Sequence, residues 1–149
     1  MAIDDLYDRD FYLWTQAQAE ALRRRGAGGN AIDYDRLAEE VSDLGKSEFR
    51  EARSFVARII EHLYKLAWSR RDEPKPEWKA EIVRFRLDAE AALTPTIRRK
   101  VEADLEHLHQ ASARAVALQF EAMEPDAPCD QSLRWTLPEI LGEAADPIG

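Results

Sequence analysis

Two histidines and one glutamate have the chemistry and spacing that could bind a metal ion. Glu106 and His109 are three residues apart, the Glu-x-x-His spacing that brings a carboxylate and an imidazole to one metal in di-iron helix bundles. His62 lies at the edge of another apolar helix face. If the two helices were neighbours, His62, Glu106 and His109 could hold zinc with an open coordination position, as a metal-dependent hydrolytic enzyme requires. The competing interpretation is structural, because histidines at the rim of an apolar stripe are more often hydrogen-bonded packing residues or surface groups.

A second polar group is centred on Glu40. At ~100° per residue on a helical wheel, Glu40 falls beside the apolar stripe of its helix and is a candidate for a buried ion pair. Its cationic partner would come from later helices. The candidate members of this buried polar cluster are Glu40, His62, Lys65, Arg84 and Arg86. Such a pair could fix the register of two helices, although desolvation makes its contribution to stability small.

The chain carries no recognised catalytic or cofactor-binding motif. Cys129 lies in a loop between prolines and would need a histidine nearby to act as a nucleophile. Ser47 lacks the surrounding glycines of a nucleophile elbow, and a role as a helix cap accounts for it. The glycines at 26, 28 and 29 follow a predicted helix rather than a strand, so they do not match a phosphate-binding loop. The sequence therefore implies no cofactor.

Composition and charge limit the class of protein. With 149 residues, 45% of them apolar, the chain is long enough for one domain spanning residues 1–149 and too apolar to be disordered. The sequence contains no run of 18 apolar residues of the kind that crosses a membrane, and its acidic start does not resemble a secretory signal. A single cysteine cannot form an internal disulfide, which agrees with a cytoplasmic protein.

The charge is unevenly distributed along the chain. The net charge of −8 divides into −5 for residues 1–45, +5 for residues 46–100 and −8 for residues 101–149. The basic middle segment, residues 46–100, could meet an anionic partner such as a nucleic acid, or it could neutralise the acidic flanks inside the fold. The overall negative charge disfavours nucleic acid and favours internal neutralisation.

Apolar residues recur at helical spacing in five segments, and a capping box marks a sixth. The first four segments are separated by the glycines near residue 28, by Gly45 and by the prolines at 74 and 76. Ser47 is the predicted cap of the third helix, and Thr94-Pro95 is a typical helix start. Thr136 and Glu139 form the capping box. The predicted helices span residues 7–25, 33–45, 47–69, 78–93 and 94–124, with a short helix after residue 136.

The expected fold is all-α. No segment alternates apolar and polar residues as a strand would, and short connections favour antiparallel neighbours. We expect a bundle of about five mostly antiparallel helices, with the short C-terminal helix packed over it. Leu37, Val41 and Leu44 fall on the stripe that should face the core, whereas Trp68 lies off its stripe, which favours exposure.

Several sequence signatures resemble the bacterial family catalogued as domain of unknown function 29. They are YDRDFYLW at 7–14, DRLAEEV at 35–41, LGKSE at 44–48, His62-Leu63 with Lys65, Trp78 followed by Arg84 and Arg86, and WTL at 135–137 with Ile140-Leu141. The resemblance implies a small, all-helical bacterial protein and supplies no activity. The glycine-rich segment 26–30 departs from the more charged segment usual in the family, so it is not expected to be a shared functional element.

The function these observations favour is that of an interaction or structural module, which binds a protein partner or self-associates through spare apolar surface. Two other classes remain open. One is a metal-dependent enzyme using His62, Glu106 and His109, and the other is a nucleic-acid-associated protein using the basic middle segment.

Overall fold

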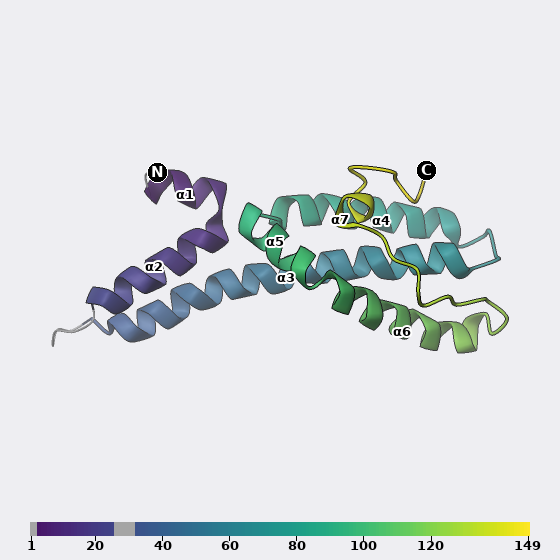
Figure 1. Cartoon of the computed structure of the whole chain (residues 1–149), viewed down its shortest axis with the longest axis horizontal. Coiled ribbons are helices and arrows are strands. Elements are labelled where there is room, and N and C mark those ends of the chain that lie inside the picture. Colours follow the sequence, from purple (N-terminus) through teal and green to yellow (C-terminus); the bar gives the residue numbers. More distant parts are fainter. Residues whose placement is uncertain (1–2, 26–31) are drawn as a thin grey trace.

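A computed structural model of the chain describes residues 3–25 and 32–149 (Figure 1). Within these residues it contains seven helices and no strand, which confirms the all-α prediction. The helices are α1 (Ile3–Arg9), α2 (Phe11–Arg25), α3 (Tyr34–Trp68), α4 (Lys75–Ala92), α5 (Pro95–Ala103), α6 (Leu105–Met123) and α7 (Leu137–Ile140).

Helix α3 is the central helix, against which α2, α4, α5, α6 and α7 pack. It contains 35 residues, which at 1.5 Å per residue makes it about 50 Å long. The predicted break at Gly45, with a new helix capped by Ser47, is wrong, because α3 runs through both residues. Gly45 instead permits a close approach of α2, since a Cβ atom at this position would lie 2.1 Å from Thr15 Oγ1. A helix tolerates one glycine at a cost of about 1 kcal/mol, so the sequence pattern alone misplaced its role.

The predicted first helix is two helices, with the break at Asp10. The Asp10 carboxylate is buried and accepts hydrogen bonds from the backbone N–H groups of Leu13 and Thr96, at 2.9 and 2.7 Å. Burial alone would raise the pKa of Asp10, but these hydrogen bonds outweigh it and lower the pKa. Asp10 therefore caps the first turn of α2 and ties it to the start of α5.

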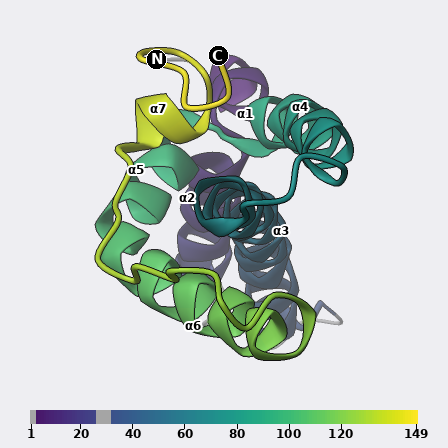
Figure 2. The same ribbon diagram turned by 90° about the vertical axis from the view of Figure 1, so that its right-hand side faces the viewer.

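The predicted fifth helix is also divided, at Asp104. The Asp104 carboxylate forms an ion pair with the Arg53 guanidinium of α3, and the backbone turns there between α5 and α6. The turn directs α6 along the side of α3 (Figure 2). The prediction of one unbroken helix over 94–124 is therefore wrong, and α3 is the longest helix that the structure describes.

The apolar core surrounds the C-terminal half of α3. Helix α4 packs along one side and α6 along another, while α5 and α7 lie on the side between α4 and α6 (Figure 2). The predicted caps are confirmed, because Thr94 accepts from the Ile97 N–H and Thr136 forms its capping box with Glu139. The large side chains buried in this core are Ile59, Ile60, Leu63, Tyr64, Trp68, Ile82, Ile97, Phe120, Leu137 and Ile140.

The N-terminal half of α3 has a thinner covering. Helix α2 packs against it in the opposite direction, with α1 folded back over α2, and this hairpin of α2 and α3 extends away from α4, α6 and α7 (Figure 1). We refer to residues 11–25 and 34–48 as the projecting hairpin. Within the described ranges, no helix is both long and apolar enough to cross a bilayer.

Candidate functional site

The two histidines proposed as metal ligands lie on opposite sides of α3. The His62 ring faces α4, with its centroid 5.7 Å from that of Phe85. The His109 ring lies 6.3 Å from that of Tyr64, which is two residues after His62 and so points about 160° away from it. Residues 3–25 and 32–149 contain no group of three His, Cys, Asp or Glu side chains that could hold a metal ion. The structure therefore does not bring His62, Glu106 and His109 together as a metal centre.

His109 has a structural role that uses both ring nitrogens. Its Nδ1 atom lies 2.9 Å from the Leu105 carbonyl oxygen, and its Nε2 atom lies 3.1 Å from the Trp135 backbone nitrogen. The carbonyl can only accept and the amide can only donate, so Nδ1 carries the proton and Nε2 accepts. The side chain is buried, with 1% of its surface exposed. His109 thus joins α6 to the strap, by which we mean residues 124–136.

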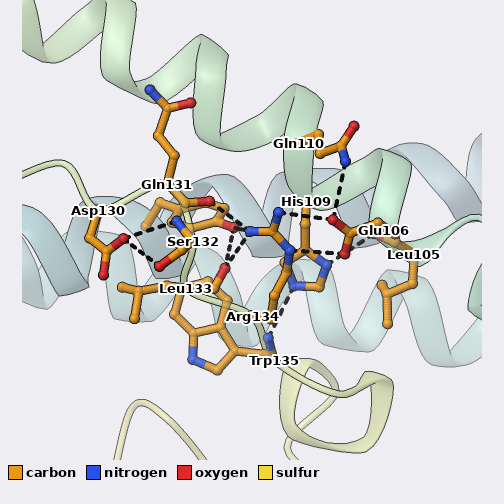
Figure 3. A network of polar contacts seen from close by, with 11 residues as sticks. Leu105, Glu106, His109, Gln110, Asp130, Gln131, Ser132, Leu133, Arg134 and Trp135 are labelled. Carbon is orange, nitrogen blue, oxygen red and sulfur yellow. Dashed lines mark hydrogen bonds and ion pairs between the residues drawn. The ribbon is translucent and has the colours of Figure 1, made fainter.

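Arg134 of the strap holds Glu106. The guanidinium donates from Nε and Nη2 to the two carboxylate oxygens of Glu106, both at 2.9 Å (Figure 3). Its Nη1 atom donates to the carbonyl oxygens of Gln131 and Leu133 and lies 3.2 Å from the Tyr64 hydroxyl. Arg134 lowers the pKa of Glu106 through these hydrogen bonds. No local sequence pattern indicates this role of Arg134, because it lies 28 residues from Glu106 in an irregular segment.

The predicted buried cluster around Glu40 does not form. Glu40 is exposed, and it lies 22 residues before His62 on the same helix, which corresponds to about 33 Å. Arg84 pairs with Glu77 and Glu81 of its own helix. Lys65 is half-buried near the other end of α3. The helical periodicity correctly placed Glu40 beside an apolar stripe, but none of α4 to α7 covers that part of the stripe.

Arg86 has a different role from the one predicted. It donates from Nε to the Ile140 carbonyl oxygen at 2.9 Å and binds both carboxylate oxygens of Asp146, at 3.0 and 2.8 Å. Arg98 forms the same bidentate contact, with two of its nitrogens donating to the two carboxylate oxygens of Glu143. Both pairs join the basic middle segment to the acidic C-terminal segment. They support the interpretation that the middle segment neutralises its neighbours within the fold.

Acidification is expected to destabilise the protein through His109. Burial lowers the pKa of His109, its bond to the Leu105 carbonyl opposes this, and Arg134 lowers the pKa further. The unfolded chain, with a histidine pKa of about 6.5, then binds more protons than the folded chain. The free energy of unfolding should fall as the pH drops below about 6.5. Urea denaturation at a series of pH values below and above 6.5 measures this change. His109→Gln should reduce the slope of the free energy of unfolding against pH, and an unchanged slope would contradict the role given to His109.

The interface between α2 and α3 in the projecting hairpin is built from small side chains. Thr15, Ala19, Ala38 and Ser42 are buried there together with Gly45. The Gln16 amide donates to the Ser42 carbonyl oxygen, and the Ser42 hydroxyl donates to the Gln16 amide oxygen, both at 3.2 Å. The two helices approach closely at this point. This leaves little room for large apolar side chains between them.

The large apolar residues of this part of α3 lie outside that interface. Leu37 is 45% exposed, Leu44 is 54% exposed, and Val41 between them is half-buried. Their spacings of four and three residues place them within about 60° on the helix. We call Leu37, Val41 and Leu44 the α3 stripe. The expectation that the stripe faces the core is wrong for Leu37 and Leu44, because α2 packs against the adjacent face.

The α3 stripe continues a face that is covered elsewhere on the same helix. Residues 55, 59 and 62 follow 37, 41 and 44 by 18 positions, which is about five full turns. In the C-terminal half this face is occupied by Phe55, Ile59 and His62 and is covered by α4. Helix α4 ends at Ala92, where Ala92 and Glu48 line the same hollow. The stripe therefore begins where the covering helix stops.

The sequence and its fold have known counterparts. The family described as "Domain of unknown function DUF29" matches residues 6–144. The chain belongs to the DUF29 family. An alpha-helical protein of unknown function from Rhodospirillum rubrum, solved as a crystal structure, shares the fold of this DUF29 chain with a TM-score of 0.79 and 21% identity, over 95% of this chain and 92% of that one. No curated protein sequence matches this DUF29 chain.

Proposed function

We propose that this protein is a protein–protein interaction module whose docking element is the α3 stripe on the projecting hairpin. The observation that carries the proposal is the exposure of Leu37 and Leu44 on a face that α4 covers in the other half of the same helix. Large apolar side chains at a/d-type spacing are the pattern by which one helix packs against another. The C-terminal half acts as a rigid base, with the strap and the C-terminal segment fixed by Arg134, Arg86 and Arg98.

The occupant that fits this surface is an amphipathic helix with basic residues at its edge. The part of α3 that lies beyond the end of α4, from Tyr34 to Glu48, has 15 residues and is about 22 Å long, which is about four helical turns. Glu40 flanks the stripe and is exposed, and Glu48 and the exposed Glu51 follow the stripe along the same face of α3. These carboxylates would attract lysine or arginine on the flank of an incoming helix and would disfavour an acidic one.

Site-specific photo-crosslinking in cells tests the proposal. A photoreactive amino acid at position 44 should form protein adducts whose mapped crosslinks fall on the apolar face of a helix. The matched control is position 114 on α6, where the exposed Arg114 lies outside the stripe. Leu37→Glu should reduce the adducts from position 44, because it charges the same docking face. Equal adducts from positions 44 and 114, or crosslinks that map to no helix, would overturn the proposal.

A further inference from the structure

We infer that the cleft between α4 and the C-terminal tail, residues 141–149, binds a small organic ammonium ion, that is, a primary amine with an apolar body. The cleft has a volume of about 420 Å³, which is within the range of small-molecule sites. Its walls come from α4, from α5 and from the tail, which passes beside α4 (Figure 1). The cleft shares no residue with the α3 stripe, so this site is independent of the proposed function.

One wall of the cleft is apolar and reaches the solvent. Val83 and Leu87 are four residues apart on α4, so they project from the same face, and they are 50% and 64% exposed. Leu93 and Leu141 also line the cleft and are half-buried. Apolar side chains gathered in a concave site, rather than scattered over the surface, favour a ligand with an apolar body.

The two arginines of the cleft are already neutralised by carboxylates of the tail. Arg86 binds both carboxylate oxygens of Asp146, and Arg98 binds both carboxylate oxygens of Glu143. Arg86 also donates to the Ile140 carbonyl oxygen, and its side chain is only 14% exposed. Bidentate arginine–carboxylate pairs are the strong class of ionic hydrogen bond. An added anion would therefore have to displace a carboxylate that is held by two such bonds.

The backbone of the tail also covers the Arg86 guanidinium. Gly142 has a φ angle of +74°, which glycine adopts without steric cost, and a Cβ atom at this position would lie 2.7 Å from Arg86 Nη1. The tail can lie this close to the guanidinium only because Gly142 has no side chain. Arg86 is thus a structural anchor of the tail and not a free cation in the cleft.

Glu90 is the charged residue of the cleft lining that has no ion-pair partner among the residues that the structure describes. It is exposed on α4, seven residues after Val83 and three after Leu87, so its carboxylate lies on the same face as the apolar wall. Together with the two carboxylates of the tail, it outnumbers the two guanidiniums by one. The cleft therefore has a net negative charge, which attracts a cation and repels an anion.

A primary ammonium on a short apolar body matches both features of the cleft. The body would cover Val83 and Leu87, and the ammonium, which has three donors and no acceptor, would lie beside the Glu90 carboxylate. An apolar cavity of about 150 Å³ accepts benzene, so a cleft of about 420 Å³ has room for one ring with a short amine side chain.

Titration of the full chain with phenethylammonium, followed by NMR of the leucine and valine methyl groups, tests the inference. The aromatic ring should shift the methyl resonances of Leu87, Leu93 and Leu141 and leave those of Leu37 and Leu44 unchanged. The expected dissociation constant is about 1 mM. Phenethyl alcohol, which has the same body without the charge, should bind about two- to fivefold more weakly, and the anion hydrocinnamate should bind more weakly than the alcohol.

Two variants of α4 separate the charge from the apolar wall. Glu90→Gln should raise the dissociation constant of phenethylammonium about two- to fivefold and leave that of phenethyl alcohol unchanged. Leu87→Ala should weaken the binding of both probes, because both use the apolar wall. The matched control is Asp88→Asn, which removes one exposed carboxylate from the opposite face of α4 and should change neither constant. All three residues are exposed, so helical circular dichroism should be unchanged.

Three results would overturn the inference. Tighter binding of hydrocinnamate than of phenethylammonium would mean that the arginines exchange the carboxylates of the tail for an added one. Equal binding of phenethylammonium and phenethyl alcohol would mean that Glu90 does not select a cation. No shift at Leu87, Leu93 and Leu141 with phenethylammonium at about 20 mM, far above the expected dissociation constant, would mean that the cleft does not bind this class of ligand.

Discussion

Gly45→Ala is expected to lower the free energy of unfolding by about 1–3 kcal/mol, although alanine favours helix by about 1 kcal/mol over glycine. The reason is steric, because the added Cβ would lie 2.1 Å from Thr15 Oγ1 and 2.9 Å from Gln16 Nε2. Thr15 is fully buried and its hydroxyl donates to the Tyr12 carbonyl oxygen, so it has little freedom to move aside. Urea denaturation followed by circular dichroism measures the change.

The control and the rescue for Gly45→Ala both lie in the same hairpin. Ser47→Ala changes an exposed residue two positions later on α3 and should alter the stability by less than about 0.5 kcal/mol. Thr15→Ala removes the atom that clashes, so Gly45→Ala should cost less in that background, and a double-mutant cycle gives the coupling. If Gly45→Ala stabilises the protein as an ordinary helical substitution does, the close approach of α2 and α3 is not a constraint.

His109→Ala is expected to lower the free energy of unfolding by about 3 kcal/mol. The substitution removes the acceptor of the Trp135 N–H, and the ring packing against Tyr64 and Trp135 is lost. Because the strap is attached to α6 at this point, the effect should include its local release. Hydrogen exchange at the Trp135 amide should speed up more than exchange in the hairpin, which distinguishes local release from global unfolding.

Two neighbouring substitutions make the His109 result interpretable. His107→Ala, two residues earlier on the exposed face of α6, should leave stability unchanged. His109→Gln keeps a terminal acceptor near the position of Nε2 and should recover part of the loss. If His109→Gln were as damaging as His109→Ala, ring packing rather than the hydrogen bond would be the main contribution.

Helix content and caps could be predicted because they depend on local spacing. The recurrence of apolar residues, the Thr94-Pro95 start and the Thr136 capping box are properties of a few consecutive residues, and the structure confirms each of them. The breaks at Asp10 and Asp104 were missed for the opposite reason. Their carboxylates bind groups 86 and 51 residues away, so no local pattern indicates that the chain turns there.

In the candidate metal site, too, local sequence predicted one feature and distant packing decided another. The Glu-x-x-His spacing correctly placed Glu106 and His109 on one helix, but which side of α3 each histidine occupies depends on how α4 and α6 pack. Trp68 is a comparable case. It lies off the main stripe and was expected to be exposed, yet it is buried, and its indole N–H donates to the Asp130 carbonyl oxygen of the strap.

By itself, the sequence determined that this chain forms amphipathic helices with an excess of acidic residues, because periodicity and charge are read directly from residue order. Only the tertiary structure decided which parts of each apolar stripe are covered. The length of α4 decided that Phe55, Ile59 and His62 are covered by it, whereas Leu37 and Leu44 on the same face remain exposed. Coverage depends on where a distant helix ends, and that is set by the packing of the whole chain.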